Sequence, residues 1–129
     1  MKILDSDHCI AILRGKLDLR DKVTPDDELA VTSISIGELT HGAYKSQRVV
    51  DNLARLDVLL AALTVLPYNE DSARRFGAVK ASLEHAGNSM HDLDLQIACI
   101  ALENASPLVT HNTSHFSRVD DLTLEDWLT

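Results

Sequence analysis

Four short, mostly apolar segments alternate along this chain with stretches of helical periodicity, and this alternation constrains the fold more than any other feature. The apolar segments are residues 2–4, 29–34, 64–66 and 107–110, and residues 122–124 are a candidate for a fifth. Continuous apolar runs of this length are typical of strands buried on both faces of a parallel sheet. We therefore expect an α/β fold: a three-layer single domain, residues 1–129, with a mostly parallel four- to five-stranded sheet flanked by helices.

The stretches between these segments predict helices. The clearest one has apolar residues three or four positions apart from Val49 to Leu63, which places them on one side of a helix. Further along, Asn69 is suited to cap a helix that Gly87 ends. The other predicted helices cover residues 8–13, 35–44 and 93–104. Helices therefore separate the first four strands from one another, as parallel pairing requires.

The amino-acid composition limits which compartment and which class of partner we expect for this protein. The net charge is −8, from 20 acidic and 12 basic residues, which argues against nucleic-acid binding through a broad basic surface. It does not exclude an enzyme that acts on nucleic acid through metal ions, because clustered carboxylates lower the net charge by themselves. Cys9 and Cys99 lie in apolar stretches, which favours reduced core residues. With no signal-peptide pattern and no apolar run near the roughly 20 residues of a membrane span, we expect a cytoplasmic protein that does not enter the membrane.

Polar residues follow or flank several of the predicted strands. Asp5 comes directly after the first strand, Glu38 lies one turn into the helix after the second, and Asn112 follows the fourth. Asp92 and Asp94 open the helix that precedes the fourth strand. Binding sites in such sheets form at the carboxyl ends of the strands, so we expect these side chains to converge. Carboxylate and amide oxygens suit Mg²⁺ or Mn²⁺, which can activate water and stabilise a leaving oxygen at a phosphate.

Several of these acids also have an ordinary structural interpretation as helix caps. Asp5 can cap the first helix. The spacing Ser35-x-x-Glu38 matches a capping box, in which the Glu side chain reaches back to the Ser amide. The spacing Ser89-x-x-Asp92 has the same geometry with Asp in place of Glu, which favours a capping role for Asp92.

Asp94 and three histidines are the other candidates for a chemical role. Asp94 lies one turn inside an otherwise apolar helix, where a carboxylate is costly to bury without a partner, and this favours function. Asn112 can also be a plain turn residue. His91, His111 and His115 fall near the predicted cleft, and each is a candidate for contact with a substrate.

Four motifs in order carry a resemblance to a known family. They are ILDSDH, SISIGELTHG, NSMHDLDLQIACIAL and PLVTHNTSHFSRVDDLTLEDW, and they span nearly the whole chain. In this order and at this spacing the sequence resembles the PIN-domain family, specifically the VapC-type toxins of toxin–antitoxin pairs. Each motif alone is a weak signal, whereas four in order form a strong one.

The resemblance implies a metal-dependent endoribonuclease. The first three acids of the family fall on Asp5, Glu38 and Asp94, which would hold Mg²⁺ or Mn²⁺. Its fourth position holds Asn112, an amide where Asp is common, so a second ion should bind more weakly because an amide adds no charge. The two positions expected to be auxiliary are Ser6, where Thr is usual, and Asp92.

Family membership also implies partners: an RNA substrate such as tRNA or mRNA, a cognate antitoxin protein that covers the cleft, and a second copy of the chain in a homodimer. Two alternatives differ from this interpretation. One is a PIN-like module that has lost catalysis through Asn112 and acts by protein contacts. The other is a phosphatase of the DxD type, with Asp5 as nucleophile and Asp7 as general acid.

Overall fold

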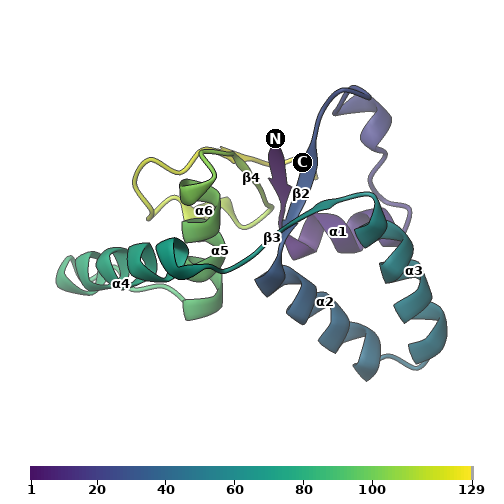
Figure 1. Ribbon diagram of the computed structural model, residues 1–129, viewed down its shortest axis with the longest axis horizontal. Coiled ribbons are helices and arrows are strands. Elements are labelled where there is room, and N and C mark those ends of the chain that lie inside the picture. The colour runs from purple at the N-terminus through teal and green to yellow at the C-terminus, as the bar shows by residue number, and fades with distance from the viewer. Residues whose placement is uncertain (129) are drawn as a thin grey trace.

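The computed structural model describes residues 1–128 as a three-layer α/β fold (Figure 1). The helices are α1 (Ser6–Leu13), α2 (Ser33–Lys45), α3 (Val49–Ala61), α4 (Glu70–His85), α5 (Asp92–Glu103) and α6 (Thr113–Phe116), with a short 3-10 turn at Leu19–Asp21. The strands are β1 (Lys2–Leu4), β2 (Leu29–Thr32), β3 (Thr64–Leu66), β4 (Leu108–Val109) and β5 (Leu124–Glu125). The predicted fold class is confirmed.

Within residues 1–128 the five strands form one parallel sheet in the order β3-β2-β1-β4-β5. In the centre, Ile3 of β1 pairs with Ala30 of β2 on one side and with Leu108 of β4 on the other. The chain thus builds the sheet outward from β1 to β3 and then returns to the opposite side of β1. The change of direction lies between β1 and β4, and crevices that bind ligands form at such a point.

Successive residues of the central strands point into two separate cores. Ile3, Ala30 and Leu108 belong to the core that includes α4, α5 and α6, whereas their neighbours in sequence belong to the core beneath α1, α2 and α3: Leu4, Val31 and Val109. Figure 1 shows these two groups of helices on opposite sides of the strands. Because side chains of a strand alternate between faces, covering both faces explains why these segments are apolar without interruption.

The start of α2 corrects one sequence prediction. The second strand ends at Thr32, two residues before its predicted end at residue 34, and α2 begins at Ser33. The N-cap is Thr32, whose hydroxyl accepts a hydrogen bond from the Ser35 amide at 3.1 Å. The Ser35–Glu38 capping box, one of the two interpretations that the sequence left open for Glu38, therefore does not form, because the Ser35 amide already has a partner. Glu38 lies in the second turn and is not needed as a cap.

The start of α5 corrects the second capping prediction. His91 is the N-cap and makes no side-chain capping bond, so Ser89 and Asp92 do not form a box. Asp92 is the first residue of the helix, and its carboxylate accepts a hydrogen bond from Lys80 of α4 at 2.9 Å. The α4 prediction is confirmed at its start, where Asn69 accepts from the Ser72 amide at 2.9 Å.

Two further expectations concern the cysteines and the membrane. Cys9 and Cys99 are both free and buried, as predicted. Throughout residues 1–128, every helix falls short of the length or apolar character that crossing a bilayer would require.

Candidate active site

Three carboxylates from separate segments come together beside the change of direction in the sheet. Asp5 follows β1 and is the N-cap of α1, Glu38 lies on the second turn of α2, and Asp94 lies on the first turn of α5. Their charges are close enough to act on one another: Asp94 raises the pKa of Asp5, and both raise the pKa of Glu38. The tertiary structure thus gathers these three predicted site residues.

Asp5 is the most buried of the three, with 7% of its surface exposed. Its Oδ1 accepts from the Ser6 amide at 2.9 Å, and its Oδ2 accepts from the Thr110 hydroxyl at 2.7 Å. Burial raises the pKa of Asp5 to about 6, because the hydrogen bond from Thr110 offsets only part of the lost hydration and the charges of Asp7 and Asp94 add to it. A nearby cation would favour the ionised form of this carboxyl.

Glu38 presents an unpartnered oxygen. Among residues 1–128, its Oε1 is buried and has no hydrogen-bond partner. Burial raises the pKa of Glu38, the charges of Asp5 and Asp94 raise it further, and His91 opposes them. A buried polar atom without a partner is uncommon in folded proteins and calls for an explanation, such as an ion that binds there.

These residues fit a divalent cation by charge and by donor type. Carboxylate oxygens are the ligands that Mg²⁺ and Mn²⁺ prefer, and an ion would satisfy the unpartnered oxygen of Glu38. Within residues 1–128, no group of three or more His, Cys, Asp and Glu side chains stands close enough to hold a metal ion. An ion bound there would require these side chains to come closer together than they stand in this structure.

The remaining predicted residues have different positions. Asp92 is exposed, and its side chain bonds to Lys80 on α4. Asn112 is half-buried at the N-cap of α6, and its backbone amide donates to the Thr110 hydroxyl at 3.0 Å. Ser6 contributes its backbone amide to Asp5. Asp92 therefore stands apart from the three gathered carboxylates, whereas Asn112 is tied to Asp5 through Thr110.

Thr110 is a residue of the site that the sequence analysis did not identify. It is fully buried after β4, and its hydroxyl connects Asp5 to the turn that carries Asn112. A hydroxyl residue at the end of an apolar strand, two positions before Asn112, is the signal that could have indicated it. The residue lies 105 positions from Asp5 in the sequence.

The three histidines expected near the cleft have different surroundings. His91 acts on Glu38, whose pKa it lowers. His111 is exposed and its Nδ1 lies 2.9 Å from a carboxylate oxygen of Asp126. His115 is exposed on α6. Of the three, His91 is the one whose charge reaches a gathered carboxylate.

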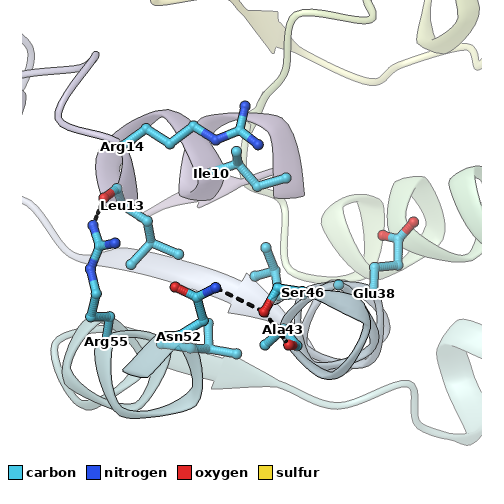
Figure 2. A pocket seen from close by; sticks show the side chains of 11 residues that line it. Ile10, Leu13, Arg14, Glu38, Ala43, Ser46, Asn52 and Arg55 are labelled. Atoms are coloured by element: carbon cyan, nitrogen blue, oxygen red, sulfur yellow. Dashed lines mark hydrogen bonds between the residues drawn. The ribbon is translucent and has the colours of Figure 1, made fainter. Parts of the chain in front are cut away.

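An open groove of about 280 Å³ lies between α1, α2 and α3, and Glu38 lines it. Figure 2 shows Ile10 and Leu13 on α1, with Arg14 directly after it, across the groove from Asn52 and Arg55 on α3, and Glu38 at one end on α2. Its other lining residues are Leu39, Gly42, Ala43, Ser46 and Leu56. The groove is thus largely apolar and leads to one of the three carboxylates.

Known proteins resemble this chain in both sequence and fold. A family model described as "PIN domain" matches residues 2–122. The tRNA(fMet)-specific endonuclease VapC of Shigella flexneri is 32% identical over 127 residues, which cover 97% of this chain and 96% of the relative. The solved structure of DNA-bound VapBC from Salmonella typhimurium aligns with a TM-score of 0.90 at 30% identity, covering 98% of this chain and 99% of that one. VapBC2 of Rickettsia felis, bound to a promoter DNA fragment, aligns with a TM-score of 0.90 at 27% identity and covers 98% of both chains.

Proposed function

The chain belongs to the PIN-domain family, and we propose that it is a metal-dependent endoribonuclease, the toxin of a type II toxin–antitoxin pair. The observation that carries this proposal is the set of three carboxylates, Asp5, Glu38 and Asp94, together with the unpartnered buried oxygen of Glu38. An RNA such as tRNA is the substrate class that the relatives support, since one of them is named a tRNA(fMet)-specific endonuclease. The cytoplasm is the compartment where such a substrate is present.

Asp5, Asp94 and Glu38 would hold Mg²⁺ or Mn²⁺. A divalent ion in such a site makes water acidic enough to attack at neutral pH and offsets the charge that develops on a phosphate. The chain's own groups prepare the site: Thr110 and the Ser6 amide hold the Asp5 carboxylate in one orientation. Glu38, with its unpartnered oxygen and raised pKa, can accept a hydrogen bond from the attacking water and orient it.

Asn112 lies at the position where the family resemblance implies that an acid is common. Its side chain can offer a carbonyl oxygen but no charge. A second ion, if the reaction uses one, would then depend on the oxygens of the substrate phosphate for part of its binding. Catalysis would therefore rest mainly on the ion held by Asp5, Asp94 and Glu38.

We expect the antitoxin-free protein to cut RNA at discrete positions in the presence of Mn²⁺ or Mg²⁺ and not in EDTA. The measurement is cleavage of purified tRNA and of total RNA, with mapping of the 5′ ends. Failure to cut any RNA, together with failure of the protein to bind Mn²⁺, would contradict the nuclease proposal. That outcome would favour a non-catalytic binding module.

The groove between α1, α2 and α3 is a surface on which the partner protein of the proposal can bind. Solved relatives are VapBC complexes, and we propose that a cognate antitoxin places an apolar segment in this groove. The apolar lining from Ile10, Leu13 and Leu56 offers the contact, and Glu38 at its end brings the antitoxin within reach of the carboxylates. We propose that the exposed Val50 and Val58 on α3 contribute an apolar surface to a homodimer.

Gly42→Leu should weaken antitoxin binding by about tenfold or more, which is the scale of a residue at the centre of an interface. Gly42 lines the groove, and a Cβ there meets no atom within 4 Å, so a side chain at this position starts in open space and extends into the groove. The matched control is Gly77→Leu, since Gly77 is also exposed in a helix, a Cβ added there meets no atom within 4 Å, and it lies outside the groove. Titration of the purified antitoxin against each variant measures the Kd. Equal Kd values for the two variants would place the antitoxin elsewhere.

A further inference from the structure

A buried polar cluster lies next to the gathered carboxylates and takes no part in the function proposed so far. At its centre is His8, which is 0% exposed. Its Nδ1 lies 2.6 Å from Oδ1 of Asp7, and its Nε2 accepts the backbone N–H of Trp127 at 3.1 Å. The cluster thus joins the beginning of the chain to its C-terminal segment.

These two contacts determine where the ring of His8 carries its proton. A backbone N–H can only donate, so Nε2 must be the acceptor with a free lone pair. The proton is therefore on Nδ1, and the ring donates it to Asp7. The carboxylate of Asp126 lies 3.7 Å from Nε2, beyond hydrogen-bond distance, and its Oδ1 accepts from the Leu128 amide at 2.9 Å. The C-terminal segment thus selects the tautomer that pairs with Asp7.

The other oxygen of Asp7 reaches across to the turn after β4. Oδ2 accepts from the His111 amide at 2.9 Å and lies 3.4 Å from the Thr110 hydroxyl. That hydroxyl in turn donates to Asp5 and accepts from the Asn112 amide. One oxygen of Asp7 therefore pairs with the ring of His8, and the other accepts from the turn after β4.

We propose that Asp7 and His8 are positioning residues, which with Thr110 and the His111 amide form a polar brace between the turn that holds Asp5 and the turn that holds Asn112. The C-terminal segment is part of the brace because Trp127 fixes the tautomer of His8. Outer partners of ligating carboxylates set the orientation of those ligands. The inference rests on the proposed function, since the reaction that it affects is RNA cleavage.

The brace makes a specific demand on the side chain at position 8. It requires a donor near Asp7 and an acceptor near the Trp127 amide. The amide of Asn branches at Cγ, so in His8→Asn its NH₂ can replace Nδ1–H. The amide of Gln branches at Cδ, so in His8→Gln its oxygen can replace Nε2. His8→Asn therefore keeps the hydrogen bond to Asp7, and His8→Gln keeps the hydrogen bond from the Trp127 amide. Both variants bury a neutral amide group in place of the ring.

We expect His8→Gln to lower kcat by about 10–100-fold, the scale for loss of an outer partner of a ligand, with KM nearly unchanged because His8 is fully buried and out of reach of RNA. His8→Asn should retain most of the wild-type kcat. The Mn²⁺ affinity of the RNA-free protein should fall in the same order. Glu125→Gln is the matched control on the C-terminal segment, because the Glu125 side chain bonds to Lys2 and to the Trp127 indole and makes no hydrogen bond to Asp7, His8 or Thr110.

Equal losses in the two variants, or a smaller loss in His8→Gln, would overturn the proposal and leave His8 as an anchor for the C-terminal segment alone. Should both variants fail to fold, ¹⁵N NMR of the wild-type ring decides. A proton on Nδ1 supports the brace, and a proton on Nε2 contradicts it. A wild-type protein that cuts no RNA would contradict the proposed function, while the Mn²⁺ affinities and the NMR spectrum would still test the brace.

Discussion

Asp5→Asn is expected to stabilise the metal-free protein by about 3 kcal/mol at pH 8 while it removes RNA cleavage. The gain arises because burial raises the pKa of Asp5 from 3.8 to about 6, so the folded protein holds the ionised carboxylate at a cost. Asn keeps the cap, since its Oδ1 can accept from the Ser6 amide and its NH₂ can donate to Thr110. Thermal unfolding in EDTA measures the difference.

The raised pKa of Asp5 also predicts how the stability of the folded protein changes with pH. A carboxyl whose pKa is raised in the folded state contributes stability at low pH and loses that contribution as pH rises through the folded pKa. The contribution of Asp5 is complete below about pH 4 and is lost between about pH 4 and pH 6. The stability difference between wild type and Asp5→Asn should therefore grow across that window and stay constant above it.

Two results would contradict this account of Asp5. One is a variant that is less stable than the wild type at pH 8, which would mean that the hydrogen bonds of the ionised carboxylate outweigh its burial. The other is a stability difference that does not change between pH 4 and pH 6. Mn²⁺ supplies a control, because an ion that binds the folded state should stabilise the wild type and not the variant.

Asp94→Asn is expected to lower kcat for RNA cleavage by more than about 100-fold, since loss of even an outer partner of a ligand costs up to that factor. Asp94 is half-buried, and its charge raises the pKa values of both Asp5 and Glu38. The substitution keeps the volume and removes the charge. It should also weaken Mn²⁺ binding and lower the pKa of Glu38, which NMR titration of the carboxyl carbon can follow.

The matched control for Asp94→Asn is Asp92→Asn. Both acids lie in the first turn of α5, so the substitutions have similar effects on the start of the helix. Asp92 pairs with Lys80 at the surface, and exposed pairs of this kind contribute about 0–1 kcal/mol to stability. We expect near wild-type cleavage from Asp92→Asn. Equal losses in the two variants would mean that the first turn as a whole, and not the charge of Asp94, supports the reaction.

Most of the fold was predictable because its signals are local. Short, mostly apolar segments between helical stretches indicate strands, and the predicted segments at 2–4 and 64–66 match the observed strands β1 and β3. The errors fall at element ends. At Thr32, one residue ends a strand and caps the following helix, so α2 starts two positions before the predicted residue 35. A capping box at Ser35 or Ser89 looks the same in sequence whether or not the hydrogen bonds form.

The candidate site was also predictable only in part. Asp5, Glu38 and Asp94 were identified from their positions at strand ends and inside an apolar helix, and the structure places them together. The sequence favoured Asp94 over Asp92 as a functional residue, because Asp94 lies inside an otherwise apolar helix, but no local pattern fixes the direction of either side chain. Packing decides this, since Asp92 bonds to Lys80 on α4 and Asp94 acts on Asp5 and Glu38.

The sequence by itself determined the layered α/β architecture and the acids that meet at the carboxyl edge of the sheet, because hydrophobic periodicity and residue chemistry are properties of short segments. Only the tertiary structure decided the supports of that site. Thr110 bonds to Asp5 across 105 residues of sequence, and Trp127 bonds to His8 across 119. Such contacts exist only once β4 and β5 have paired beside β1, and no local pattern records a hydrogen bond between segments that meet through folding.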